Sequence, residues 1–397
     1  MVENIIIDVV GSFADGKTTL VRALTNESTL RHSEEKKRGI TIRLGYAHFV
    51  LYKCKKCGYL SRKQQCETCG SASELFRKVS IIDSPGHKTL MTIMLSGAAL
   101  VSGAILVIAA NQKCPQPQTE EHLNALRIIG IKNLVVAQTK VDIVSPQRAK
   151  ENYQEIKKFL SDSGFDNVPI IPVFSTANVN IVELIQEIGK FPLENSVAKK
   201  APVMLAVRSF DANSPGTAIK ELVGGILGGA LKEGELSSGD EIEIYPGIQV
   251  KNGWQPLKSK VIDMHSEFGK ESKVSKGLTV GLQTALDPAL TRRDNLAGSL
   301  IVSVKNRPQL KPRISFEYSP LEKQEKNLFK RSIQKNEVVL LNILAGKALA
   351  TVTAVSGNKV VAALSNSVLP YYVGDNAIIS RKLDNVWTLA GSGKIYD

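Results

Sequence analysis

The sequence has little of what marks secreted or membrane-spanning proteins. It contains only 5 cysteines in 397 residues, and no signal sequence precedes its first apolar run, so a disulfide framework is not expected. The longest nearly apolar stretch, Gly97 to Ala110, is shorter than the roughly 18 to 20 residues that cross a bilayer. A buried helix followed by a buried strand explains that stretch better. We therefore expect a soluble, cytoplasmic protein.

Acidic residues are fewer than basic ones. Lysine and arginine number 51 against 38 aspartates and glutamates, which gives a formal net charge of +13. A positive protein attracts polyanions through phosphate neutralisation and counterion release, so nucleic acid is the first candidate partner, although solvated lysines alone give the same balance. A hydrophobic content of 43% over this length exceeds what one core needs, and two or three domains are expected.

The pattern of apolar runs changes along the chain. Residues 1–200 alternate short β-rich runs with stretches of helix length, which predicts an α/β domain on a mostly parallel sheet. Residues 201–311 and 312–397 carry short strands between glycine turns, which predicts two small β-barrels. Two prolines and several basic residues between Val304 and Pro312 disfavour regular structure, so we expect a linker there. The strands expected in the first domain are Ile5–Val10, Val79–Ile82, Ala104–Ala109, Leu134–Ala137 and Ile170–Val173.

A glycine-rich run follows the first of these strands. Residues 11–18 read Gly-Ser-Phe-Ala-Asp-Gly-Lys-Thr, which matches the phosphate-loop pattern G-x-x-x-x-G-K-[ST] before a helix-compatible segment. In such a loop the backbone N–H groups and the helix N-terminus face phosphate oxygens, the lysine adds positive charge and the hydroxyl ligates Mg²⁺. The candidate nucleotide-binding residues are Ala14, Asp15, Gly16, Lys17, Thr18 and Thr19, and Thr18 is also a candidate Mg²⁺ ligand.

A second element of a nucleotide site follows the strand at residues 79–82. Asp83 is placed to hold Mg²⁺ through water, and Gly86 to donate its N–H to a γ-phosphate. His87 is the candidate for orienting the attacking water. Thr41, which ends a charged segment, is expected to ligate Mg²⁺ only in the triphosphate state. The alternative interpretation of His87 is a structural histidine. The alternative interpretation of the segment that ends at Thr41 is a solvated run of charges.

The preference for guanine is predicted by residues after the strand at 134–137. Thr139, Lys140 and Asp142 fit the pattern [NT]-K-x-D, in which the carboxylate accepts two hydrogen bonds from guanine and adenine offers neither donor. Taken alone, this pattern is usually only a surface turn, but its distance from the other two motifs makes it specific. A last base contact is expected from Ser175, with Thr176 and Ala177, after the strand that begins at Ile170.

Four of the five cysteines form two C-x-x-C pairs in a short segment, residues 52–70. Thiolates at this spacing enclose tetrahedral Zn²⁺, and a closed four-thiolate site has a structural role. Metal-free cysteines or redox pairs are the alternatives. The candidate zinc ligands are Cys54, Cys57, Cys66 and Cys69, whereas Cys114 stands alone.

Together these segments resemble the gamma subunit of translation initiation factor 2, a GTPase related to elongation factor Tu. The likeness rests on Arg38–Tyr46, the cysteine segment, Asp83–His87, Met94–Ala99, Pro115–Thr119, Arg208–Asp211, Gly224–Gly229 and Leu286–Thr291. The resemblance implies a GTP-binding domain followed by two β-barrels, in which GTP favours binding of initiator methionyl-tRNA for delivery to the small ribosomal subunit. It also implies alpha and beta subunits that complete a heterotrimer, and the short N-terminus indicates the archaeal type.

The sequence departs from this family in its phosphate loop. The family usually has Gly-His-Val-Asp-His-Gly-Lys-Thr, whereas residues 12–15 here read Ser-Phe-Ala-Asp, so the acidic group has moved by one place. Rival interpretations are another GTPase that delivers tRNA, such as elongation factor Tu or the selenocysteine-specific factor, a GTP-gated scaffold with negligible hydrolysis, and a GTPase subunit of a metabolic enzyme. The cysteine segment argues against elongation factor Tu and against the selenocysteine-specific factor.

Overall fold

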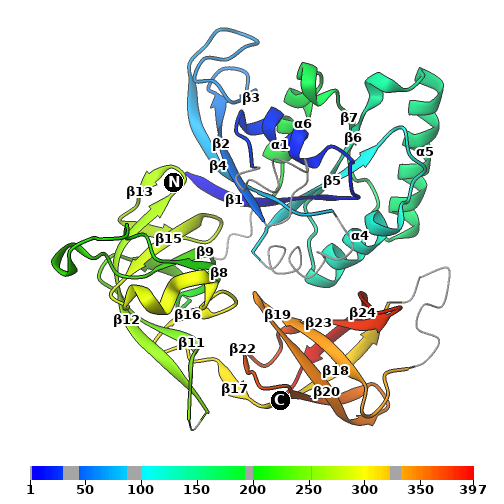
Figure 1. The fold of residues 1–397 in the computed structure, drawn as a ribbon. Helices are drawn as coiled ribbons and strands as arrows, with labels where there is room; N and C mark the ends of the chain where they lie inside the picture. Colours follow the sequence, from blue (N-terminus) through cyan, green and yellow to red (C-terminus); the bar gives the residue numbers. More distant parts are fainter. Residues whose placement is uncertain (1, 30–43, 87–99, 193–199, 252, 322–331) are drawn as a thin grey trace. The chain divides into compact units, whose positions relative to one another are not determined.

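The computed structural model divides the chain into two compact units, Met1–Asn195 and Ser196–Asp397 (Figure 1). It describes residues 2–29, 44–86, 100–192, 200–251, 253–321 and 332–397. In this described part no helix is long and apolar enough to span a membrane.

The first unit is built on a sheet of seven described strands in the order β3-β2-β4-β1-β5-β6-β7. Strands β4, β1, β5, β6 and β7 run parallel, while β2 and β3 are antiparallel additions at one edge. The mostly parallel sheet predicted from the sequence is confirmed, and its antiparallel edge carries the cysteine segment. The strands are β1 (Glu3–Gly11), β2 (Gly45–Cys54), β3 (Leu60–Ser61), β4 (Ser73–Asp83), β5 (Gly103–Ala109), β6 (Leu134–Thr139) and β7 (Ile170–Pro172).

Helices cover both faces of this sheet (Figure 1). Helices α1 (Lys17–Thr25) and α6 (Ile181–Gly189) share one apolar core with alternate residues of the strands, whereas α4 (Pro117–Ile129) packs against β1 and β5 from the other face. Ser145 caps the N-terminus of helix α5 (Pro146–Asp162), because its hydroxyl accepts the N–H of Arg148. Proline occupies the first position of this helix. Two short 3-10 helices, η2 (Val141–Ile143) and η3 (Ser175–Ala177), follow β6 and β7.

The second unit contains two closed β-barrels, each of six described strands. In the first barrel the order is β11-β16-β8-β9-β15-β12, and pairing between β11 and β12 closes the ring. Its strands are β8 (Val203–Phe210), β9 (Ile226–Glu233), β11 (Glu241–Val250), β12 (Gly253–Ser266), β15 (Thr279–Thr284) and β16 (Leu300–Ser303). Short additions to it are β10 (Glu235–Ser237), β13 (Gly269–Lys270), β14 (Lys273–Ser275), η4 (Ile219–Glu221) and η5 (Pro288–Asp294).

The second barrel has the order β18-β21-β20-β19-β23-β24, closed by pairing of β18 with β24. Its strands are β18 (Arg313–Pro320), β19 (Val338–Ile343), β20 (Gly346–Ser356), β21 (Lys359–Leu364), β23 (Asn376–Leu383) and β24 (Val386–Ile395). Each barrel encloses its own apolar core. The predicted fold class, an α/β domain with an inserted cysteine segment followed by two barrels, is confirmed.

The expected linker between the barrels is not irregular throughout. Residues Gln309–Lys311 form strand β17, which pairs with β22 (Leu369–Tyr371). Pro308 and Pro312 lack N–H groups, but they flank the three residues that pair, so the prediction of no regular structure is wrong there. The guanidinium of Arg307 donates to both carboxylate oxygens of buried Glu243, at 2.8 and 2.9 Å. This pair fixes the start of the segment to the first barrel.

Candidate functional site

The phosphate loop lies between β1 and α1. Gly11 ends the strand with φ +147°, and a Cβ there would lie 2.3 Å from the carbonyl oxygen of Val107 on the neighbouring strand, so only glycine fits. Gly16 precedes the helix with φ +91°, and Ala14 also has a left-handed conformation at φ +62°. The loop therefore brings the backbone of residues 14–18 around the N-terminus of α1, as expected for phosphate binding.

Lys17 lies inside this loop. Its ammonium donates to the carbonyl oxygens of Gly11 at 3.0 Å and Ser12 at 2.7 Å, and burial lowers its pKa. A Cβ on Gly86 would lie 2.2 Å from the Lys17 nitrogen and 2.7 Å from the Gly11 carbonyl oxygen. Gly86 is thus in direct contact with the phosphate loop, at a place where no larger residue fits.

Oxygen ligands suited to Mg²⁺ converge next to the loop. The hydroxyl of Thr18 donates to Asp83 Oδ2 at 2.8 Å, and the hydroxyl of Thr29 donates to the same oxygen at 2.5 Å. A threonine hydroxyl beside a buried carboxylate at a strand end is a hard-oxygen donor set, which fits Mg²⁺. Thr18 and Asp83 thus lie within hydrogen-bond distance of each other, while their roles as Mg²⁺ ligands stay predictions. Thr29 adds a second hydroxyl at Asp83 that no sequence motif marked.

Further side chains brace the phosphate loop. Asp15, which is buried, accepts the N–H of Ser12 at 2.9 Å, and burial raises the pKa of its carboxyl to about 6. From α4, His122 accepts the N–H of Gly11 on Nδ1 at 3.3 Å, and Gln118 accepts the hydroxyl of Ser12 at 3.1 Å. Burial lowers the pKa of His122 to about 3, so its imidazole is neutral and can accept that bond.

The predicted guanine loop meets the phosphate loop. The Thr139 hydroxyl donates to the backbone carbonyl of Asp15 at 2.6 Å. Lys140 follows with φ +57° at the start of η2, which contains Asp142 with an exposed side chain. The predicted contact segment Ser175–Ala177 forms η3, which contacts α1. Thr139 therefore lies against the phosphate loop, and η3 lies against helix α1.

Two predicted residues, Thr41 and His87, lie outside the described residues. Their roles as a Mg²⁺ ligand and as the residue that orients water stay predictions. The same holds for the helix expected before the buried strand β5.

The four predicted zinc ligands come together between β2 and β4. All four Sγ atoms lie within 4.8 Å of one another, with separations of 3.5 Å for Cys54–Cys69 and for Cys57–Cys66. Four sulfurs about 2.3 Å from a tetrahedral zinc lie about 3.8 Å apart, so the cluster fits this ion. Hydrogen bonds from Ser71 lower the pKa of Cys69 to about 6, whereas hydrogen bonds to the neighbouring thiols raise the pKa of Cys57 to about 12. The geometry of the four sulfurs therefore carries the fit to zinc.

The cysteine segment is attached to two helices of the same unit. The guanidinium of Arg62 donates to the carbonyl oxygens of Ala23 at 3.0 Å and Leu24 at 2.6 Å in the last turn of α1. On α6, the amide of Gln186 bonds both the N–H and the carbonyl oxygen of Leu60.

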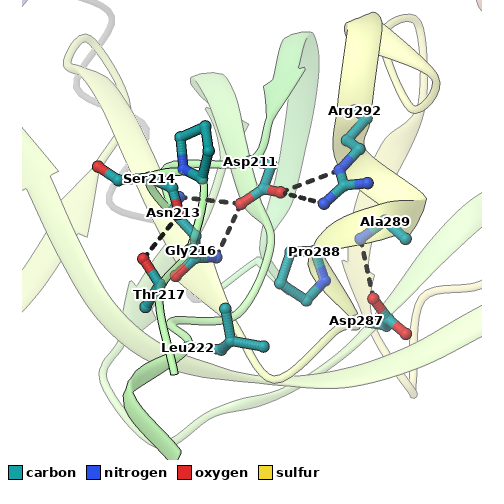
Figure 2. Close-up of a pocket in the computed structure, with 11 residues that line it drawn as sticks. Asp211, Asn213, Ser214, Gly216, Thr217, Leu222, Asp287, Pro288, Ala289 and Arg292 are labelled. Carbon is teal, nitrogen blue, oxygen red and sulfur yellow. Dashed lines mark hydrogen bonds and ion pairs between the residues drawn. The ribbon is translucent and has the colours of Figure 1, made fainter. Parts of the chain in front are cut away.

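A separate cavity of about 470 Å³ lies on the first barrel (Figure 2). It lies between the loop after β8 and η5, where Asp211 accepts from Arg292 at 2.9 to 3.0 Å and from the side chain of Asn213 at 2.7 Å. Two segments that carried the family resemblance, Arg208–Asp211 and Leu286–Thr291, therefore lie at one place, which the sequence did not indicate.

Comparison with known proteins gives the family. Residues 2–192 match the family model described as Elongation factor Tu GTP binding domain, and residues 313–395 match Initiation factor eIF2 gamma, C terminal. The chain is 42% identical to translation initiation factor 2 subunit gamma of Methanocaldococcus jannaschii, over 98% of this chain and 96% of that protein. The chain belongs to the translation initiation factor 2 subunit gamma family. As a member of this family it is a GTPase of translation initiation that delivers initiator tRNA.

Other members of the gamma-subunit family give similar agreement. The subunit of Pyrococcus furiosus is 41% identical over 98% of this chain and 97% of that protein, and that of Archaeoglobus fulgidus is 42% identical over 98% and 93%. The resemblance stated from the sequence is confirmed.

Solved structures with low identity support the fold alone. A bacterial selenocysteine-specific elongation factor matches with a TM-score of 0.77 at 22% identity, over 99% of this chain and 58% of that one. The elongation factor SelB from Methanococcus maripaludis, in complex with a GTP analogue, matches with a TM-score of 0.75 at 20% identity, over 100% of this chain and 79% of that one.

Proposed function

We propose that this gamma-subunit family member works as a Mg²⁺-dependent GTP switch, with its triphosphate state binding initiator methionyl-tRNA. Alpha and beta subunits complete its heterotrimer, and the small ribosomal subunit receives the tRNA in the cytoplasm. The observation that carries the proposal is the convergence of three segments on the N-terminus of α1: the phosphate loop, the strand end with Asp83 and Gly86, and the guanine loop with Thr139.

Each segment has a distinct task. The phosphate loop holds the β- and γ-phosphates with its backbone N–H groups and Lys17, while Gly86 donates its N–H to the γ-phosphate. Asp142 accepts hydrogen bonds from guanine, Lys140 covers the base plane, and Ser175, Thr176 and Ala177 form the far wall of the base site. Thr18, Thr41 and Asp83 hold Mg²⁺, which supplies charge neutralisation at the phosphates when it is bound.

Loss of the γ-phosphate is the switching event. The N–H of Gly86 loses its acceptor and Thr41 loses the ion that orders it, so the segments that carry them are released. His87, next to Gly86, orients the attacking water. The four cysteines hold Zn²⁺ in a structural role. The functional domains are residues 1–200, 201–311 and 312–397, with the cysteine segment at residues 52–70.

A second candidate is a GTP-gated scaffold with very slow hydrolysis. It is favoured by the altered phosphate loop, in which Ala14 holds a left-handed conformation and Asp15 is buried against the N–H of Ser12. Substitution of His87 would distinguish these functions, because loss of the imidazole should slow GTP hydrolysis and leave nucleotide affinity unchanged.

Single-turnover hydrolysis by the full chain and its His87→Ala variant tests this choice, with GTP binding measured in parallel. The switch predicts hydrolysis at least about tenfold slower in the variant, with GTP affinity unchanged. Equal, very slow rates in the two proteins would favour the scaffold. An Asp142→Asn variant tests the base site, because it should weaken GDP binding while improving binding of xanthosine diphosphate, whose 2-oxo group is an acceptor.

A further inference from the structure

Two buried amides connect helix α5 to the guanine loop. Gln138 immediately precedes Thr139, and its side chain is 2% exposed, while Asn152 in α5 is 0% exposed. Gln138 Nε2 donates to Asn152 Oδ1 at 2.9 Å and to the carbonyl oxygen of Ala149 at 2.8 Å. Both amide protons of Gln138 are thus used by α5, and the end of strand β6 is fixed to that helix.

The other half of the Asn152 amide reaches a different loop. Its Nδ2 donates to the carbonyl oxygen of Gln112 at 2.9 Å, in the loop that connects β5 to α4. The same carbonyl accepts from Arg148 at 2.8 Å. Glu155, which is paired with Arg148 at 2.9 Å, accepts the N–H of Cys114 at 2.8 Å. Helix α5 therefore holds the residue 112–114 loop by three hydrogen bonds and the guanine loop by two.

These contacts complete a ring around the nucleotide site. The loop that α5 holds leads into α4, which reaches the phosphate loop through His122 and Gln118. The phosphate loop returns to the guanine loop through the bond from Thr139 to Asp15. Asn152 is the side chain that joins the guanine loop to the loop before α4, although it contacts neither the phosphate loop nor Asp142 in any described hydrogen bond.

We infer that Asn152 is a positioning residue for guanine selectivity, which fixes the guanine loop so that Asp142 meets the base in one geometry. The inference rests on the proposed role of Asp142. An asparagine suits this place because it must accept from Gln138 and donate to Gln112 at once. Aspartate keeps the acceptor but sets a carboxylate against the Gln112 carbonyl, and leucine supplies neither bond.

The expected effect concerns discrimination between bases. Inosine lacks the 2-amino group of guanine, so the ratio of GDP to IDP affinity reports how well Asp142 is held against that amine. A hydrogen bond to a carboxylate contributes about tenfold or more in affinity when its geometry is good. If Asn152 positions the guanine loop, substitution of Asn152 should narrow the ratio of GDP to IDP affinity by about tenfold. Substitution of a purely structural residue should lower the two affinities equally.

The experiment measures the affinities of the full chain for GDP and IDP by calorimetry, with Mg²⁺ present. The variants are Asn152→Leu, Asn152→Asp and Gln138→Met, and the control is Gln154→Ala at an exposed position of α5. We expect a narrowed ratio in Asn152→Leu and Gln138→Met, an intermediate ratio in Asn152→Asp and no change in the control. Each single variant removes the shared Gln138–Asn152 bond and one further bond, so the double variant of residues 138 and 152 should narrow the ratio by less than the two single effects combined.

A wild-type ratio in the Asn152 and Gln138 variants overturns the inference, even where their melting temperatures fall. If Asn152→Leu does not fold, Gln138→Met decides, since it leaves α5 intact. Asp142→Asn in the same assay separates this failure from failure of the base site. A changed ratio in Asp142→Asn with unchanged ratios in the others overturns the positioning role only, whereas an unchanged ratio in Asp142→Asn overturns the role of Asp142 and the inference together.

Discussion

The hydroxyl of Thr139 donates a 2.6 Å hydrogen bond to the backbone carbonyl of Asp15, which ties the guanine loop to the phosphate loop. Both residues are buried, at 3% and 1% exposure, so the bond is shielded from water. In the proposed site these loops bind opposite ends of the nucleotide, so a change in the distance between them should affect the contacts at both ends.

Thr139→Val removes this hydroxyl at nearly constant volume. The unsatisfied carbonyl of Asp15 and the loosened loops cost about 1 to 2 kcal/mol, which lowers affinity for GDP and for a GTP analogue by about five- to thirtyfold. Thr139→Asn, which keeps a side-chain donor and fits the same [NT]-K-x-D pattern, should keep most of the affinity. Titration with fluorescent nucleotides measures both variants, and an unchanged affinity in Thr139→Val would show that the loops are held together by other contacts.

Ala14→Gly should stabilise the protein. Ala14 is exposed and has φ +62°, a conformation that costs an L-residue about 1 kcal/mol relative to glycine. Relief of that cost raises the melting temperature by about 2 to 4 °C in a unit of this size. Ala149→Gly, within α5, is the matched control and should lower it, because glycine weakens a helix interior. Destabilisation by both variants would refute the strain at Ala14.

Asp8 gives the protein a measurable pH dependence. It is fully buried in β1, and burial raises the pKa of its carboxyl to about 7 from 3.8. The folded state therefore binds this proton more tightly than the unfolded state, and stability falls as pH rises from about 4 to 7. Asp8→Asn removes that contribution.

Thermal unfolding at fixed concentrations of GDP and Mg²⁺ measures the stability of both proteins. The stability of Asp8→Asn relative to the parent protein should increase from pH 4 to pH 8. Asp15, whose pKa is raised to about 6, adds a similar slope in both proteins. Parallel stability curves for the two proteins would contradict the assignment to Asp8.

Removal of zinc should destabilise the C-terminal turn of helix α1. Arg62, between the two cysteine pairs, caps the carbonyls of Ala23 and Leu24 in that helix. Chelation frees the cysteine segment and uncaps α1, so amide exchange in its last turn should speed up. Hydrogen exchange with and without chelator tests this, and Arg62→Ala should give the fast exchange even with zinc bound. Unchanged exchange on chelation would show that the segment stays folded without metal.

Much of the fold was predictable because local signals agreed with the tertiary structure. The predicted strands Ala104–Ala109 and Leu134–Ala137 lie within β5 and β6, where continuous apolar runs form buried parallel strands. The phosphate, guanine and cysteine motifs were predictable because their chemistry is confined to short, ordered spacings. The antiparallel pairing of β2 with β4 was not predictable, because it depends on a partner distant in sequence.

The supporting residues of the site were not predictable for the same reason. Asn152 and His122 lie on helices whose sequences show only that some face is buried. Their roles arise from hydrogen bonds to Gln138 and Gly11, which lie 14 and 111 positions away. Thr29 likewise had no motif to mark it, and only its contact with Asp83 reveals it.

The most direct test of the account is filter binding of the chain, with its proposed alpha partner, to methionylated initiator tRNA and to elongator tRNA. Each tRNA is tested with a non-hydrolysable GTP analogue and with GDP. A GTP switch that carries initiator tRNA should bind the initiator more tightly with the GTP analogue than with GDP, and more tightly than it binds the elongator. Equal binding in both nucleotide states, with alpha present, would contradict this function.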